Sequence, residues 1–331
     1  MAAEAKGKKN HLIWLPLLLF ILLTSVFLAA GCGPSDGNGP QEGKLEVIAT
    51  TFPPFDFARQ AGGGHVQVSM LLPPGSESHT YEPTPKDLIR IKSCDLFIYN
   101  GGPSDTWVDR LLEAAEIDPA KTVRMMDYVS LIEEAEEGVL ETEEHEEESL
   151  PHLHHYDEHI WTDPMNALRI TEGIAGRMEA ADPGHAADYR ANAGHYADQL
   201  RALDQTFKAI VEAGPRREII VADRFPLIYF TTAYSLDYTA AFPGCAAETD
   251  PKPRTVAAII ERVREEGIPY IFHIEFSNQK LADLVAEETG AQKLLFHTAH
   301  NVSKEEIESG MTSYLSIMEA NAENLRKGLG E

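Results

Sequence analysis

The chain has 331 residues, more than one compact core normally uses, and this length predicts about two domains of ~150 residues each. Hydrophobic residues make up 43% and charged residues 24%, which excludes a wholly disordered or collagen-like chain. The formal net charge of −25 argues against nucleic acid as a partner, because an acidic chain repels the phosphate backbone. Three cysteines without a CxxC pair supply neither a disulfide framework nor a thiolate metal site.

The first part of the chain has the pattern of an export signal. Basic residues precede an uncharged apolar run over residues 12–30, and the sequence LAAGC then ends at Cys32. The small residues before Cys32 predict a cleaved signal peptide over residues 1–31, which resembles a bacterial lipoprotein signal with Cys32 as the lipid-carrying residue. The alternative is an uncleaved membrane anchor, because the apolar run is just long enough to span a bilayer. Both alternatives predict an extracytoplasmic protein attached to the cell membrane, on its outer face or periplasmic side.

The next part of the chain alternates between strands and helices. Residues 32–44 are rich in glycine and proline, as in a flexible tether. Strands are expected at residues 45–52, 66–72 and 95–102, with a helix at 85–93, and this alternation predicts a parallel sheet in an N-terminal α/β lobe over residues 45–163.

Residues 131–158 interrupt the lobe with an acidic loop. Ten of the sixteen residues from Glu133 to Glu148 are glutamate, so no core can form there. The histidines of this segment are His145, His152, His154 and His155. The loop is either a solvated insertion or a low-affinity collector of metal ions, in which imidazoles and carboxylates raise the local cation concentration.

From Pro164 the hydrophobic period changes to that of helices. Residues 164–180 and 186–213 are expected to form a helical connector over residues 164–213, broken at the turn that contains Pro183. A C-terminal α/β lobe over residues 214–331 follows. Its expected strands cover 217–223, 270–275 and 293–297, and its expected helices cover 255–266, 278–289 and 304–329. The fold class is therefore α/β, with ligands in the cleft between two lobes.

Four metal-capable side chains fall at the cleft-facing ends of predicted elements. His79 lies in a loop between a strand and a helix, and His159 directly precedes a helix. Asp223 and His297 each end a predicted strand. Three imidazoles and one carboxylate suit tetrahedral Zn²⁺. His300 is assigned to a loop without a ligand role.

Five segments carry a family resemblance over almost the whole chain after residue 44: VSMLLPPGSESHTYEPTPKDL, DLFIYNGGPSDTWVDRLL, HIWTDPMNALRI, ADYRANAGHYADQLRALDQ and YLSIMEANAENL. From Leu45 to Leu329 the chain resembles the solute-binding lipoproteins of bacterial zinc and manganese ABC importers (cluster A-I, zinc type). The resemblance implies two lobes joined by one rigid helix. It also implies that a monomer captures a dication and delivers it to a membrane permease, and that the chain is not an enzyme.

The resemblance also implies a ligand set. His79 and His159 match the first two histidine ligands of the family. The third position falls at Asp223, with Glu248 as the alternative because the local segment contains an insertion, and the fourth falls at His297. Three histidines favour Zn²⁺ over Mn²⁺, because Mn²⁺ has the lower intrinsic affinity for such ligands.

Two other classes of protein compete with metal transport. An exported zinc hydrolase would need an open coordination position and a general base, and the chain has no HExxH; its one GxSxG match, GPSDG at residues 33–37, lies in the expected tether. A surface adhesin or scaffold need not hold metal at all, so a metal titration separates it from a transport protein. Cys94 and Cys245 fall in different lobes and are expected to be small packing residues rather than a disulfide pair.

Overall fold

The computed structural model describes residues 43–79, 81–134, 156–242 and 252–330. Several predicted features therefore lie outside the described residues: the signal peptide, Cys32, Cys245, Glu248 and the loop histidines His145, His152, His154 and His155. Among the described helices, none combines the length and the apolar composition needed to cross a membrane.

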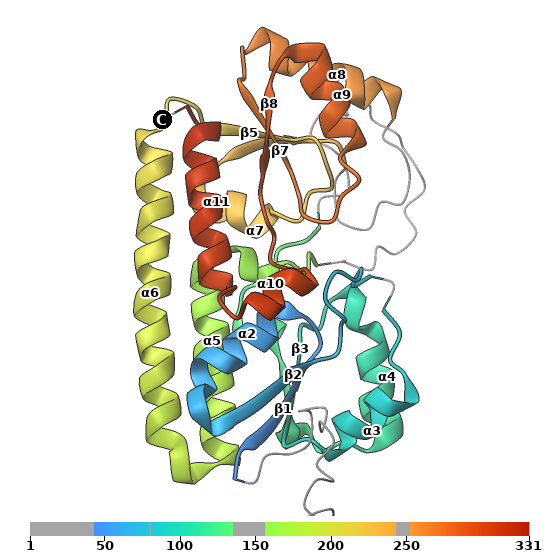
Figure 1. The fold of residues 1–331 in the computed structure, drawn as a ribbon, viewed down its shortest axis with the longest axis vertical. Helices are drawn as coiled ribbons and strands as arrows, with labels where there is room; N and C mark the ends of the chain where they lie inside the picture. Colours follow the sequence, from blue (N-terminus) through green and yellow to red (C-terminus); the bar gives the residue numbers. More distant parts are fainter. Residues whose placement is uncertain (1–42, 80, 135–155, 243–251, 331) are drawn as a thin grey trace, which may run out of the picture. The chain divides into compact units, whose positions relative to one another are not determined.

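The N-terminal lobe is built on a four-stranded parallel sheet with the strand order β2-β1-β3-β4 (Figure 1). The strands are β1 (Leu45–Ala49), β2 (Val66–Met70), β3 (Leu96–Tyr99) and β4 (Thr122–Arg124). The helices of this lobe are α2 (Phe52–Gly62), α3 (Pro85–Ser93) and α4 (Thr106–Ala115). Cys94 is a buried free thiol behind α3, as its expected packing role requires.

The C-terminal lobe repeats this plan with a second parallel sheet of order β6-β5-β7-β8. Its strands are β5 (Glu218–Val221), β6 (Asp237–Ala240), β7 (Tyr270–His273) and β8 (Gln292–Leu295). Its helices are α7 (Ile228–Tyr234), α8 (Pro253–Glu265) and α9 (Lys280–Thr289). Two parallel-sheet α/β lobes confirm the predicted fold class.

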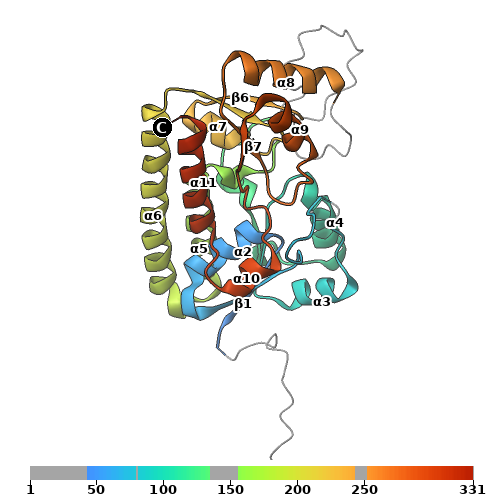
Figure 2. The same ribbon diagram turned by 45° about the horizontal axis from the view of Figure 1, so that its top comes forward.

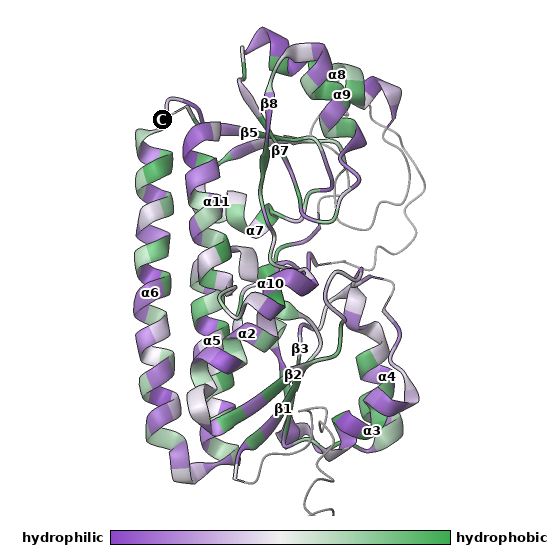
Figure 3. Cartoon of the chain, viewed as in Figure 1, coloured by the Kyte–Doolittle hydropathy of each residue, from purple (hydrophilic) through white to green (hydrophobic). Residues whose placement is uncertain are grey.

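Long helices run beside both sheets. They are α5 (Pro164–Ala181), α6 (Ala186–Ala213) and α11 (Tyr314–Gly328), the last preceded by the short α10 (Lys304–Ser309). Figures 1 and 2 both show α6 alongside α5 and α11. Hydrophobic and hydrophilic residues alternate along α6 in Figure 3, because one face of this helix is buried against its neighbours.

Both faces of each sheet are covered, which explains the apolar strands. In β3, Leu96 and Ile98 point into the core shared with α2 and α5, whereas Phe97 and Tyr99 point into a separate cluster with α3 and α4. Successive side chains of a strand face opposite sides of the sheet, so a strand buried on both sides must be apolar throughout.

The structure differs from the sequence-based expectation at two ends of elements. The first strand stops at Ala49, and α2 begins at Phe52 with two prolines in its first turn, where proline is tolerated. The expected single terminal helix is two helices, because Gly310 ends α10 with φ +65° and Ser313 caps α11. Elements that the sequence analysis did not predict are α2, α4, β4, α7 and β6.

Candidate metal site

Three loops bring three histidines together. His79 lies between β2 and α3, His159 directly precedes the short 3₁₀ turn before α5, and His300 lies between β8 and α10. One ligand nitrogen from each ring lies within 4.8 Å of the other two, and the ring centroids are 5.1, 5.4 and 6.3 Å apart. We call this group the three-histidine cluster. It joins two residues that precede α5 with one residue of the C-terminal lobe.

His79 is oriented by a buried carboxylate and a serine. The hydroxyl of Ser104 donates to Oε1 of Glu158 at 2.6 Å and lies 2.8 Å from Nδ1 of His79. Oε1 of Glu158 is itself 3.2 Å from the same nitrogen. Because the serine hydroxyl already donates to Glu158, His79 Nδ1 must carry the proton that fills this contact, and Nε2 is left as the metal-binding nitrogen.

His159 is held in the same way by its neighbour in sequence. Oδ1 of Asp157 accepts from the backbone N–H of His159 at 2.8 Å and lies 3.1 Å from its Nδ1. The main chain of Asp157 is fixed by Tyr229 of α7, whose hydroxyl donates to the Asp157 carbonyl at 3.1 Å and accepts from the N–H of Ile132 at 3.0 Å. His159 is 1% exposed, so its orientation is set inside the protein and not by solvent.

His300 is presented by a loop that is tied down at Thr298. The indole N–H of Trp161 donates to the Thr298 carbonyl at 2.8 Å, and the Thr298 N–H donates to Glu275 at 2.7 Å. The ring of Trp161 also contacts His300, with centroids 5.0 Å apart. Burial lowers the pKa of His300 well below 6.5, and neighbouring cationic groups lower it further. His300 is therefore neutral at physiological pH, which is the form of imidazole that binds a metal.

Asp223 and His297, the other two ligands expected from the sequence, are not in this group. Asp223 follows β5, and its carboxylate accepts from the N–H groups of Arg224 at 2.9 Å and Ile274 at 3.3 Å. Nδ1 of His297 accepts from the Ala299 N–H at 3.0 Å, because the chain turns back on itself with Ala299 at φ +60°. His297 therefore shapes the loop that presents His300, and the structure groups His300 with His79 and His159 while Asp223 and His297 lie outside that group.

A charged pair lies beside the cluster. Nη1 of Arg224 is 3.3 Å from Oε2 of Glu77, and Oε1 of Glu77 is 3.9 Å from Nε2 of His79. Burial acts to raise the pKa of Glu77, but the charges of Arg224 and His79 prevail and hold it below its usual value. Glu77 is therefore ionised at neutral pH and supplies a carboxylate next to the three imidazoles.

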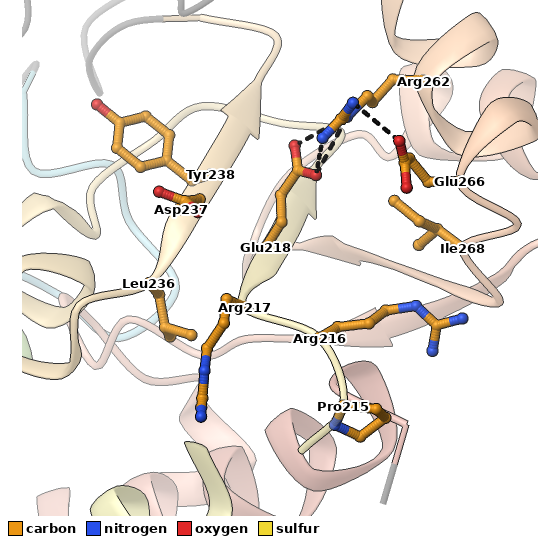
Figure 4. Close-up of a pocket in the computed structure, with 10 residues that line it drawn as sticks. All are labelled: Pro215, Arg216, Arg217, Glu218, Leu236, Asp237, Tyr238, Arg262, Glu266 and Ile268. Atoms are coloured by element: carbon orange, nitrogen blue, oxygen red, sulfur yellow. Dashed lines mark hydrogen bonds and ion pairs between the residues drawn. The ribbon is translucent and has the colours of Figure 1, made fainter. Parts of the chain in front are cut away.

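A cavity of about 570 Å³ opens away from the cluster, at the amino ends of β5 and β6 (Figure 4). Three of its charged groups pair with one another, since Arg262 lies 2.8 Å from Glu218 and 3.2 Å from Glu266. Its lining residues, all within the described part of the chain, include no histidine or cysteine. Ligands of parallel sheets bind at the opposite, carboxyl ends of the strands, so this cavity is not a candidate metal site.

The cluster has the chemistry of a zinc site. Neutral imidazoles at short separation are borderline ligands that prefer Zn²⁺ to Mn²⁺, and carboxylates on the outer nitrogens of two of them fix their orientation. Sequence reasoning missed His300 because strand β8 ends at Leu295, two residues before the predicted end, which leaves both histidines of HTAH in the loop. It also missed Asp157 and Glu158, which the adjacent letters DEH could have indicated.

Comparison with known proteins finds zinc-binding and zinc-uptake proteins. The sequence pattern of the family described as "ZnuA: Zinc-uptake complex component A periplasmic" matches residues 47–328. The "High-affinity zinc uptake system protein ZnuA" of Bacillus subtilis is 29% identical over 314 residues, covering 94% of this chain and 97% of that protein. The "Zinc-binding lipoprotein AdcA" of Streptococcus pneumoniae is 27% identical over 310 residues. This chain spans 60% of the length of that relative.

Solved structures show the same fold. The zinc-bound ZnuA-like domain of Streptococcus pneumoniae AdcA matches with a TM-score of 0.71 and 25% identity, over 87% of this chain and 100% of that one. The metal-dependent lipoprotein YcdH of Bacillus subtilis matches with a TM-score of 0.71 and 26% identity, over 86% and 99% of the two chains.

Proposed function

This chain belongs to the family of periplasmic component A of zinc-uptake complexes, and we propose that it captures Zn²⁺ outside the cytoplasm and delivers it to the membrane permease of an ABC importer. The observation that carries the proposal is the convergence of His79, His159 and His300 from three loops, with their ligand nitrogens within 4.8 Å of one another. Zn²⁺ is here the transported ion and not a resident cofactor.

Zinc is preferred to manganese because of the donor set. Three imidazoles are softer ligands than carboxylates, and Zn²⁺ binds nitrogen ligands more tightly than Mn²⁺ does. Nanomolar affinity corresponds to about −12 kcal/mol, which pre-oriented imidazoles help to reach because little side-chain freedom remains to be lost. Capture is also favoured over catalysis, since the family to which the chain belongs is one of transport components.

We propose His79, His159 and His300 as the protein ligands, in place of the set that includes Asp223 and His297. The carboxylate of Glu77 is not counted among the ligands, because Arg224 lies 3.3 Å from its Oε2; with Oε1 3.9 Å from Nε2 of His79, it supplies a nearby negative charge.

The proposed location and partner follow from the N-terminal pattern. A lipid on Cys32 would keep the folded lobes near the membrane, where a permease can accept the ion, and the tether over residues 32–44 would let them reach it. The histidines of the acidic loop would add a weak collecting surface for cations. We expect the protein to act as a monomer.

Metal binding to the full chain tests this proposal. We expect the purified wild-type protein to bind one Zn²⁺ tightly at pH 7.5 in a chelator-competition titration, and more tightly than Mn²⁺. His79→Ala and His159→Ala should each abolish tight binding. His300→Ala should do the same, while Asp223→Ala should retain it.

A matched control is His195→Ala, which removes an exposed histidine of α6. If tight binding survives His300→Ala but is lost in His297→Ala or Asp223→Ala, the ligand set expected from the sequence is correct. Failure of the wild-type protein to bind Zn²⁺ would refute the transport function.

A further inference from the structure

We propose that the ion pair between Glu77 and Arg224 is a clasp across the mouth of the metal site, which slows the entry and the release of Zn²⁺ alike. This inference rests on the proposed function, because it concerns the exchange of the ion that the three-histidine cluster would hold. It assigns to these residues a kinetic role that is separate from coordination.

The pair joins the two lobes. Glu77 lies in the loop after β2, two residues before His79, and Arg224 lies in the segment between β5 and α7. The two residues are 147 positions apart, and Nη1 of Arg224 donates to Oε2 of Glu77 at 3.3 Å. The contact therefore ties the loop that carries one proposed ligand to the opposite sheet, and the lobes cannot part at this point without breaking it.

The pair also borders a cavity that reaches the cluster at His300. This cavity holds about 140 Å³ and is lined by residues of both lobes, among them Ser76, Glu77, Arg224, Phe276 and His300. The side chains of Glu77 and Arg224 are 44% and 21% exposed, whereas the side chain of His79 is 18% exposed. The pair thus lines the same cavity as His300, and the Glu77 side chain is more exposed than that of Arg224 or His79.

The charges of the pair cancel, and the clasp therefore controls the rates of zinc exchange rather than the affinity. An isolated guanidinium beside the cluster would repel a dication, and an isolated carboxylate would attract it. Paired, the two groups contribute little net charge. Their contact stabilises the closed arrangement whether or not an ion is inside, so it lowers the rates of entry and release by similar factors and leaves the equilibrium affinity almost unchanged.

The test is the double variant Glu77→Gln/Arg224→Gln in the full chain, which removes the ion pair without changing the net charge. Zn²⁺ release into excess chelator is followed by stopped-flow spectroscopy, and the dissociation constant is measured by chelator competition. We expect release to accelerate by about twofold to fivefold, the range that a partly exposed ion pair supports, with the dissociation constant changed by less than about twofold. Raising the ionic strength should reduce the difference from wild type, because salt screens the pair.

Each single variant removes one charge of the pair and leaves the other beside the cluster. Glu77→Gln removes the negative charge and keeps the guanidinium of Arg224 beside the cluster, so it should weaken zinc binding. Arg224→Gln leaves the carboxylate beside His79 and should tighten it. The matched control is Glu218→Gln/Arg262→Gln, which removes an ion pair of the same kind at the amino ends of the strands, away from the cluster (Figure 4).

The outcomes are distinct. If the wild type binds Zn²⁺ and the double variant releases it no faster than the control variant, the clasp is refuted while the proposed function stands. Faster release with an unchanged entry rate would also overturn it, because the pair would then stabilise only the occupied site. If the wild-type protein binds no Zn²⁺, the proposed function and the clasp fail together. Unchanged thermal unfolding of the metal-free variants establishes that each one is folded.

Discussion

Replacing Glu158 by glutamine changes a single buried atom next to His79. In the wild type, Oε2 of Glu158 accepts from the backbone N–H of Ser104 at 2.9 Å, and Oε1 accepts from the Ser104 hydroxyl at 2.6 Å. Oε1 is also 3.2 Å from Nδ1 of His79, and Glu158 is 5% exposed. The carboxylate therefore accepts at every contact and requires a proton on Nδ1 of His79.

A glutamine amide cannot reproduce this pattern. Its oxygen must face the Ser104 N–H, because two donors cannot face each other, and its NH₂ group then points to the Ser104 hydroxyl and His79. That arrangement favours the His79 tautomer with the proton on Nε2, which removes the lone pair needed for the metal. Losing such an outer hydrogen bond typically costs tenfold to 100-fold in metal affinity, or about 1.4 to 2.7 kcal/mol. We therefore expect Glu158→Gln to weaken Zn²⁺ binding by this factor.

The assay is chelator competition at pH 7.5 on the full chain. The control is Glu113→Gln, which removes the same charge from an exposed position on α4. The melting temperature of the metal-free Glu158→Gln protein should not fall below that of the wild type, because the substitution also removes a buried charge. Equal dissociation constants for Glu158→Gln and Glu113→Gln would refute the view that Glu158 sets the tautomer of His79.

Three further predictions concern pH and the support of the site. Zinc affinity should fall between pH 7.5 and pH 5.5, because an ordinary imidazole has a pKa of about 6.5 and must be neutral to bind; equal calorimetric affinities would contradict histidine ligation. The hydroxyl of Tyr229 fixes the main chain of Asp157. Tyr229→Phe should therefore lower the free energy of unfolding by about 1 kcal/mol in urea titrations. It should also weaken zinc binding more than the control Tyr238→Phe does. Burial raises the pKa of Asp105 to about 7. Between about pH 4 and pH 7 the folded state therefore keeps a proton that the unfolded state has released. The free energy of unfolding falls as pH rises through this range. The melting temperature of Asp105→Asn minus that of the wild type should therefore increase from pH 4 to pH 7. A constant difference across that range would contradict the raised pKa.

Periodic hydrophobic patterns predicted most of the regular elements. The helix over 85–93 and the helix over 186–213 have the predicted bounds, because each begins and ends at local signals such as the Thr84–Pro85 start. Three of the elements that were not predicted are short. Helix α7 has seven residues, and β4 and β6 are three- and four-residue strands on the outer edges of their sheets. Such short segments carry too few periods to identify.

The sequence by itself determined the class of fold, the family and two of the histidines that the structure brings together, because His79 and His159 lie in segments whose pattern is local. Only the tertiary structure distinguishes His297 from His300, because it groups His300 and not His297 with these two histidines. These residues are three positions apart in one loop, and their roles depend on contacts with Asn321, Trp161 and Glu275 from distant parts of the chain. Contacts of the loop with these remote residues fix its path and so the positions of both imidazoles, and no spacing along the sequence records that path.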